Sequence, residues 1–203
     1  MFIYLQGYRC ITMKRRIKTV TGILTIIAIA AIGWLAYSEL AKNDAGGTDT
    51  VLTLTFQEYE WTYTLTDLGE MDSYTGDGGM KTQIDVIGPW TFKGVRFSTL
   101  LADIGLLPMG DLEMNVIGAD GHNQTFDLSA ITGNVTTYDA AGNETEGCGC
   151  GGGAKAVPLF AYKQDGGSIG DENGPIRVAY VGDSPVYTRS HYWVTQVVRI
   201  ELK

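Results

Sequence analysis

The chain has few cysteines, few histidines, and few basic residues beyond its N-terminal part. Three cysteines and two histidines occur among 203 residues. The part after residue 50, about 150 residues, is long enough to bury a core without disulfide staples. From residue 51 to residue 203 we count 20 acidic and 9 basic side chains, a net charge of −11. Such a surface repels phosphate backbones, so we predict no nucleic-acid partner.

One long stretch near the N-terminus contains no charged residue. Residues 19–38 are uncharged and consist mainly of Ile, Leu, Ala, Val and Gly. Twenty helical residues span about 30 Å, the thickness of a bilayer core. Trp34 and Tyr37 lie near the far end of the run, and a basic cluster precedes it. This pattern predicts a transmembrane helix whose N-terminal side stays in the cytoplasm.

The predicted anchor defines the organisation of the chain. We expect a single-pass protein of the cell membrane with an extracytoplasmic C-terminal domain; a cleaved signal peptide is the alternative. Met13, which is followed by Lys14-Arg15-Arg16, looks more like the natural translation start than Met1 does. Residues 1–12 are therefore interpreted as an extension that results from a wrongly assigned start. The predicted segments are a cytoplasmic N-terminus (1–18), an anchor (19–38), a linker (39–50) and an exported domain (51–203).

Strand patterns dominate the exported domain. Alternating or β-branched runs predict strands at 51–56, 60–65, 82–87, 90–92, 113–118, 124–128, 157–162, 176–181 and 193–202. Helical spacing predicts a helix over 97–104, capped by Ser98 and ended by Gly105, and a short helix begins near Thr66. The Gly/Asp stretch 72–79 is interpreted as a loop. The fold class is therefore α+β, with many short mixed strands and one or two short helices.

Five short blocks then carry a family resemblance. They are Trp90-Thr-Phe-Lys-Gly94-Val with Leu100-Leu101, Ala119-Asp120-Gly121-His122, Pro158-Leu-Phe-Ala-Tyr162, Gly174-Pro175-Ile-Arg177-Val178, and Trp193-Val194 with Ile200-Glu201. In this order they resemble the sulfite oxidase-type, molybdopterin-binding domain of oxidoreductases. The resemblance implies that fold, and it implies molybdopterin as a cofactor, with molybdenum held by one protein cysteine thiolate.

The cysteine that the resemblance implies is missing. It is expected at about residues 75–87, where no cysteine occurs, and nine basic residues are few for holding an anionic pterin. We therefore favour a degenerate relative that binds no molybdopterin and acts by binding a small ligand or a membrane protein partner. An active molybdopterin oxidoreductase that passes electrons to a membrane carrier is one alternative. A surface metal or redox protein built on Cys148 and Cys150 is another.

Cys148-Gly-Cys150 lies in a glycine-rich insertion. Two thiols one residue apart can form a small-ring disulfide, chelate a soft metal or act as a redox pair. The spacing is not that of a structural zinc site. A loop disulfide is the favoured interpretation, and a metal or redox role is the alternative.

Four further residues are candidates for a cofactor or ligand pocket. Arg177 occupies the family's G-P-x-R position, where an ion pair with one of many acids is favoured over contact with an anion in the pocket. His122 fits a hairpin turn, where packing is favoured over binding. His191 lies near Arg189, and a surface loop is favoured over a position that faces a pocket. No H-E-x-x-H or G-x-x-x-x-G-K motif occurs, and we predict neither a hydrolase nor a nucleotide-binding protein.

Three acceptor sequons for N-glycosylation lie in the predicted exported domain, at Asn123, Asn134 and Asn143. Each is followed after one residue by threonine. They matter only in a host that glycosylates such sites.

Overall fold

A computed structural model describes residues 49–145 and 156–203. The chain divides into two compact units, Met1–Gly46 and Gly47–Lys203, and the described residues belong to the second. The anchor predicted at 19–38, most of the linker, Cys148 and Cys150 lie outside the described residues. Within the described ranges, no helix is long and apolar enough to cross a membrane.

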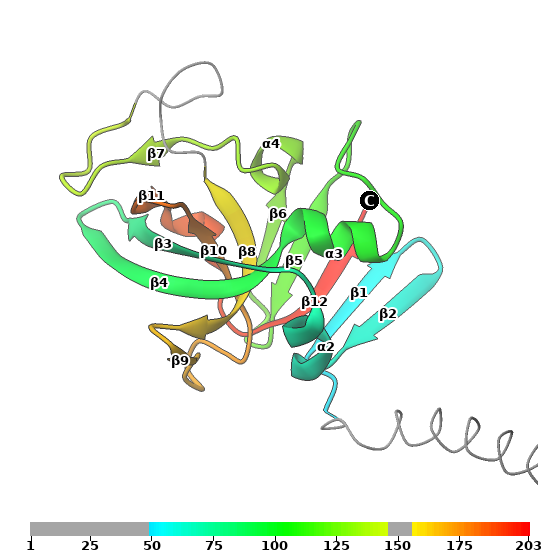
Figure 1. Ribbon diagram of the computed structural model, residues 1–203. Coiled ribbons are helices and arrows are strands. Elements are labelled where there is room, and N and C mark those ends of the chain that lie inside the picture. Colours follow the sequence, from blue (N-terminus) through cyan, green and yellow to red (C-terminus); the bar gives the residue numbers. More distant parts are fainter. Residues whose placement is uncertain (1–48, 146–155) are drawn as a thin grey trace, which may run out of the picture. The chain divides into compact units, whose positions relative to one another are not determined.

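The first sheet is built from both ends of the domain. Its strands are β1 (Leu52–Phe56), β2 (Tyr59–Tyr63), β5 (Met114–Gly118), β6 (Asn123–Phe126) and β12 (Val197–Leu202), in the order β2-β1-β12-β5-β6 (Figure 1). β1 runs parallel to β12, and the other pairs are antiparallel. Leu52 and Leu54 are buried on one face, while Thr53 and Thr55 lie on the other. The period of two that predicted this strand thus sets its buried face.

The second sheet curls. It contains β3 (Ser73–Lys81), β4 (Val86–Arg96), β7 (Thr137–Tyr138), β8 (Val157–Gln164), β9 (Gly167–Ser168), β10 (Arg177–Val181) and β11 (Val186–Arg189). The order is β10-β8-β4-β3-β11-β7, and β9 pairs with β8. Although β3 and β10 are not neighbours in this order, Asp77 and Gly182 form a bridge of two backbone hydrogen bonds of 2.9 and 3.1 Å. The curl therefore brings β3 onto β10.

Three short α-helices and a 3-10 turn complete the described fold: α2 (Leu65–Glu70), α3 (Phe97–Asp103), α4 (Leu128–Ile131) and η1 (Ser190–Tyr192). Thr64 caps α2, and the Asp67 carboxylate accepts from the Thr64 amide at 2.7 Å, which forms a capping box. α3 confirms the predicted helix and its end at Gly105, whose φ is +77°. The predicted cap at Ser98 is wrong, because Arg96 holds the N-cap position without a side-chain hydrogen bond.

Several strand predictions are corrected. The stretch predicted as a loop at 72–79 forms most of β3. The two strands predicted on either side of Gly88-Pro89 form one long strand, β4, and the stretch from Thr82 to Asp85 forms a turn before it. β7, β9 and β11 were not predicted, because each is too short to show a period.

The core lies between the two sheets and is rich in aromatic side chains. The Phe97 and Phe160 rings stack with centroids 4.3 Å apart, and Phe126 meets Phe97 edge to face at 5.7 Å. Tyr180 is fully buried, and its hydroxyl donates to the Ala130 carbonyl at 2.9 Å. Because these residues come from both sheets and from α3 and α4, the cluster joins the elements into one core.

Candidate functional site

Arg177 is a buried cation. It begins β10, directly after Gly174, Pro175 and Ile176, and only 5% of its surface is exposed. Within the described residues its Nε has no hydrogen-bond partner and no carboxylate forms an ion pair with it. The favoured prediction of an ion pair is thus wrong within the described part of the chain.

Aromatic rings surround the Arg177 guanidinium instead. Its central carbon lies 5.5 Å from the ring centroids of Phe92 and of Trp193, which is cation–π distance. Burial lowers the pKa of Arg177 to about 10, so the group remains charged at neutral pH. The sequence singled out Arg177 but not its neighbours, since Phe92 and Trp193 are far apart in the chain and meet only through the fold.

Arg189 and His191 lie shortly before Trp193 in the chain, but both side chains are exposed. The Arg189 Nε donates to the Tyr138 hydroxyl at 2.9 Å. His191 lies in η1 and packs against Tyr192 with ring centroids 4.0 Å apart; partial burial and the charge of Arg189 lower its pKa. Neither side chain joins the buried site, and a surface position for His191 is confirmed.

His122 lies in the other sheet, in the turn between β5 and β6. Its amide donates to the Asp120 side chain at 2.9 Å, and its carbonyl accepts from the Gly118 amide at 2.8 Å. The side chain is exposed, so the predicted packing role is wrong. The structure therefore does not gather Arg177, Arg189, His191 and His122 into one pocket.

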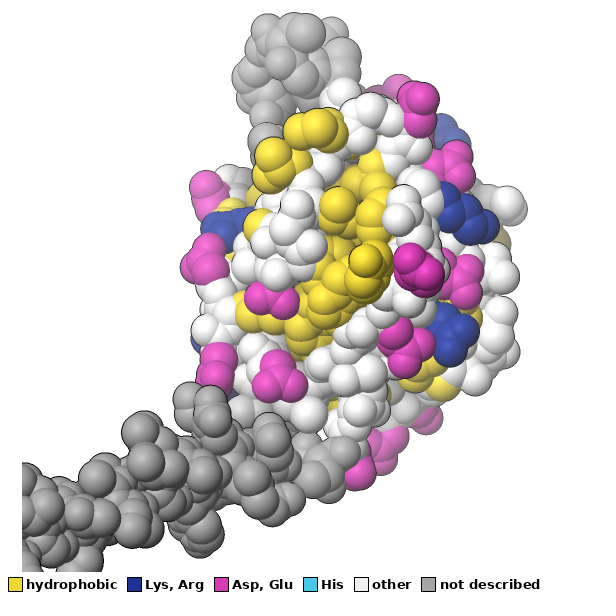
Figure 2. All heavy atoms as spheres, turned by 90° about the vertical axis from the view of Figure 1, so that its right-hand side faces the viewer, with side chains coloured by type: hydrophobic (Ala, Val, Ile, Leu, Met, Phe, Trp, Pro, Cys, Tyr) yellow, Lys and Arg dark blue, Asp and Glu magenta, His cyan; other side chains and the backbone are white. Residues whose placement is uncertain are grey.

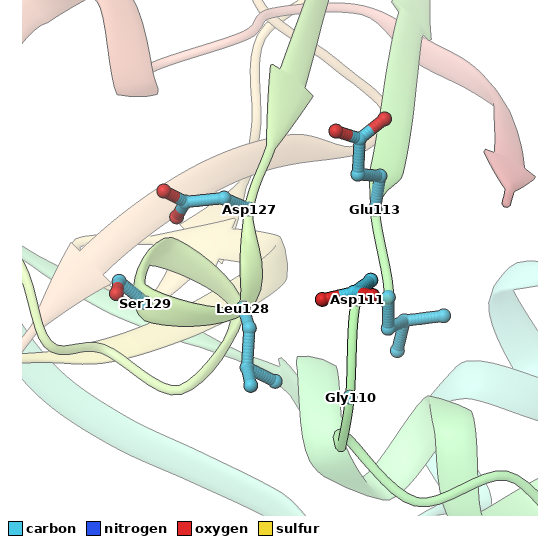
Figure 3. Close-up of a pocket in the computed structure, with 7 residues that line it drawn as sticks. Gly110, Asp111, Glu113, Asp127, Leu128 and Ser129 are labelled. Atoms are coloured by element: carbon cyan, nitrogen blue, oxygen red, sulfur yellow. The ribbon is translucent and has the colours of Figure 1, made fainter.

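A shallow hollow of about 240 Å³ lies between the loop before β5 and the start of α4 (Figure 3). It carries three carboxylates, Asp111, Glu113 and Asp127, but the Asp127 side chain is already the N-cap acceptor of α4, at 2.8 Å from the Ala130 amide. No group of three metal-ligating side chains suited to an ion occurs in the described ranges. The hollow therefore carries no argument for a metal.

One stretch matches the G-x-S-x-G spacing of serine hydrolases, at residues 166–170. In that class the serine sits on a turn between a strand and a helix. Here Ser168 lies in β9, which forms a hairpin with β8, and it is exposed. The local geometry is therefore not a nucleophile elbow.

One face of the domain carries an apolar strip framed by acidic side chains, with few basic ones (Figure 2). On this side lie the β1–β2 hairpin and the loop between α3 and β5. Their exposed apolar side chains include Tyr59, Leu107 and Met109, which are 58%, 63% and 62% exposed. Exposed apolar area rimmed by polar groups is typical of surfaces that bind partners.

The comparisons with known proteins bear on the fold. No protein-family model matches the chain, and no curated protein matches it. Among solved structures, the chain is similar to the sulfane dehydrogenase SoxCD from Paracoccus pantotrophus, with 15% identity and a TM-score of 0.51. The match covers 74% of this chain and 37% of the SoxCD chain. The chain thus spans well under half of that chain, and the likeness supports a distant molybdopterin-domain fold.

The described residues do not fit a molybdenum cofactor. The window in which the resemblance implies a thiolate, 75–87, is mostly the strand β3 and contains no cysteine. A Cβ placed on Gly78 would lie 2.1 Å from the Tyr180 carbonyl oxygen, and one on Gly76 would lie 2.7 Å from the Gly182 oxygen. β3 is packed against backbone at these positions, where a ligand side chain has no room. We therefore derive no chemistry through molybdenum.

Proposed function

We propose that this chain is a membrane-anchored, extracytoplasmic relative of sulfite oxidase-type domains that has lost the molybdenum chemistry and acts by binding. The packing of β3 carries the proposal. Where the resemblance implies a cysteine thiolate, β3 has no cysteine but glycines that lie against β10. A soft thiolate ligand has no replacement there. Binding is thus the function supported best.

Arg177 gives the binding proposal its ligand chemistry. A buried guanidinium with no carboxylate partner in the described chain is complementary to a small anion. Trp193 lies close enough to report on binding through its emission. Titration of the full-length protein with sulfate, sulfite and phosphate should change tryptophan emission in the wild type but not in Arg177→Met. An equal response of both proteins would contradict this role of Arg177.

Metal analysis tests the loss of redox chemistry. The full-length chain is purified from its native host, and molybdenum and acid-released pterin fluorescence are measured per chain. We expect neither in stoichiometric amount. Stoichiometric molybdenum with pterin would overturn the binding proposal and establish the second candidate, an active oxidoreductase, which the likeness to a dehydrogenase favours.

The Cys148-Gly-Cys150 proposal lies outside the described residues and stays a prediction. Mass spectrometry with and without reductant separates its alternatives. A mass that rises by about 2 Da on reduction indicates a disulfide. An unchanged mass together with bound zinc or copper indicates a metal site.

A further inference from the structure

We propose that Asn134 is an N-glycosylation acceptor, a modification that rests on the extracytoplasmic location proposed above. Three of the six asparagines of the chain lie in Asn-x-Thr sequons, and all three are exposed in the described domain. The three sequons differ in their hydrogen bonds and secondary structure, and these differences favour Asn134 as the acceptor.

The segment that holds Asn134 presents the two reactive side chains to solvent. Residues 134–136 lie in no helix or strand, between α4 and β7. Asn134 and Thr136 are exposed, whereas Val135 between them is buried at 8% and the Asn134 amide donates to the Ser129 carbonyl at 2.8 Å. Within the described ranges, neither the side-chain amide of Asn134 nor the Thr136 hydroxyl forms a hydrogen bond. Both functional groups are thus accessible, and the segment is paired with no described strand.

At Asn143 the same groups are engaged. Its Nδ2 lies 3.2 and 3.4 Å from the two carboxylate oxygens of Asp139, and its backbone amide donates to that carboxylate at 2.9 Å. The hydroxyl of Thr145 in this sequon pairs with the Thr137 hydroxyl at 2.5 Å. An oligosaccharyl transferase would have to break these contacts in the folded domain.

At Asn123 the obstacle is the sheet. The sequon forms most of β6, and it is paired with β5 through Asn123–Ile117 and Thr125–Asn115. Modification after folding would need β6 to open, because an acceptor peptide must fit into the transferase. Asn134 is therefore the acceptor that the folded domain offers.

The reaction is a group transfer. A bond forms between the Asn134 Nδ2 and the anomeric carbon of an oligosaccharide. The bond from that carbon to the phosphate of a lipid-linked donor breaks, and one Nδ2 proton is released. The lipid-linked oligosaccharide phosphate and the transferase come from the host. The glycan adds a bulky, solvated group to the domain surface.

The test measures the mass of the full-length protein purified from its native host and maps the peptide that contains Asn134. We expect a mass above that of the sequence. The increment at this peptide should be lost in Asn134→Gln and in Thr136→Ala, and kept in Thr136→Ser, which retains the hydroxyl. Asn143→Gln is the matched control and should keep the increment.

External protease applied to intact cells separates the two proposals. A domain that is digested from outside but carries unmodified Asn134 would overturn the acceptor site and leave the location standing. A protected domain with unmodified Asn134 would overturn both. An increment that persists at the Asn134 peptide in Thr136→Ala would also contradict the proposal, because sequon recognition needs the hydroxyl.

Discussion

Replacing Arg177 tests what the buried cation contributes. Because burial lowers its pKa to about 10, and each pKa unit corresponds to about 1.4 kcal/mol, the charged form is disfavoured in the fold by on the order of 3 kcal/mol. Two cation–π contacts with Phe92 and Trp193 offset this by about 1 to 2 kcal/mol each. The two contributions nearly cancel, so the charge itself adds little stability.

This balance predicts an unusual order of variants. Arg177→Met removes the charge and keeps an unbranched, polarisable chain between the rings, so the free energy of unfolding should change by less than about 1 kcal/mol. Arg177→Lys keeps a buried charge but loses the planar group that stacks on the rings, and should cost about 1 to 3 kcal/mol. Urea unfolding of the full-length chain in detergent, followed by tryptophan emission, measures both, with the exposed Arg199→Met as control.

The pH dependence gives an independent check. The folded state releases the Arg177 proton at a lower pH than the unfolded state does, so above pH 10 the wild type should gain stability relative to Arg177→Met. A cost of more than about 2 kcal/mol for Arg177→Met, together with no cost for Arg177→Lys, would contradict this balance. That result would mean that the charge has a partner among residues outside the described ranges.

Further outcomes follow from packing and titration. Gly78→Ala should cost at least about 3 kcal/mol in urea unfolding, because its Cβ would lie 2.1 Å from the Tyr180 carbonyl oxygen. Gly69→Ala in α2, with no atom within 4 Å, should add about 0.5 to 1 kcal/mol. Tyr180→Phe should cost about 0.5 to 1.5 kcal/mol, because it removes one hydrogen bond to the Ala130 carbonyl, which still accepts from the Gly133 amide at 3.1 Å. Burial and the hydrogen bond to Asp103 raise the pKa of Tyr63, so the wild type should lose stability above pH 10, and Tyr63→Phe should lose less between pH 8 and pH 11.

Elements set by local signals could be predicted from the sequence. β1 follows from the alternation that buries Leu52 and Leu54, and α3 ends where Gly105 takes a positive φ. For α2 the signal was also local, but the cap lies at Thr64, two residues before the expected start at Thr66. Such patterns depend on neighbours in the chain, which a sequence displays directly.

β3 shows why other parts could not be predicted. Its glycines give a turn signal, because glycine is weak in strands on local grounds. They are placed there by a contact distant in sequence: Gly78 lies against Tyr180 on β10. In the same way, the ring neighbours of Arg177 come from β4 and from the segment before β12. Contacts between segments that are distant in sequence therefore determine the strand β3 and the rings around Arg177. The glycine-rich composition of β3 alone predicts a loop.

The packing of β3 also bears on the proposed loss of molybdenum chemistry. A cysteine at Gly76, Gly78 or Gly79 would place its Cβ within 2.7 Å of neighbouring backbone or ring atoms, so β3 would have to separate from β10 or β11. That separation would break the Asp77–Gly182 bridge that holds the curl of the sheet. Restoring a thiolate at these positions therefore conflicts with the present fold. The close packing of β3 thus supports the proposal that the domain has a role other than holding molybdenum.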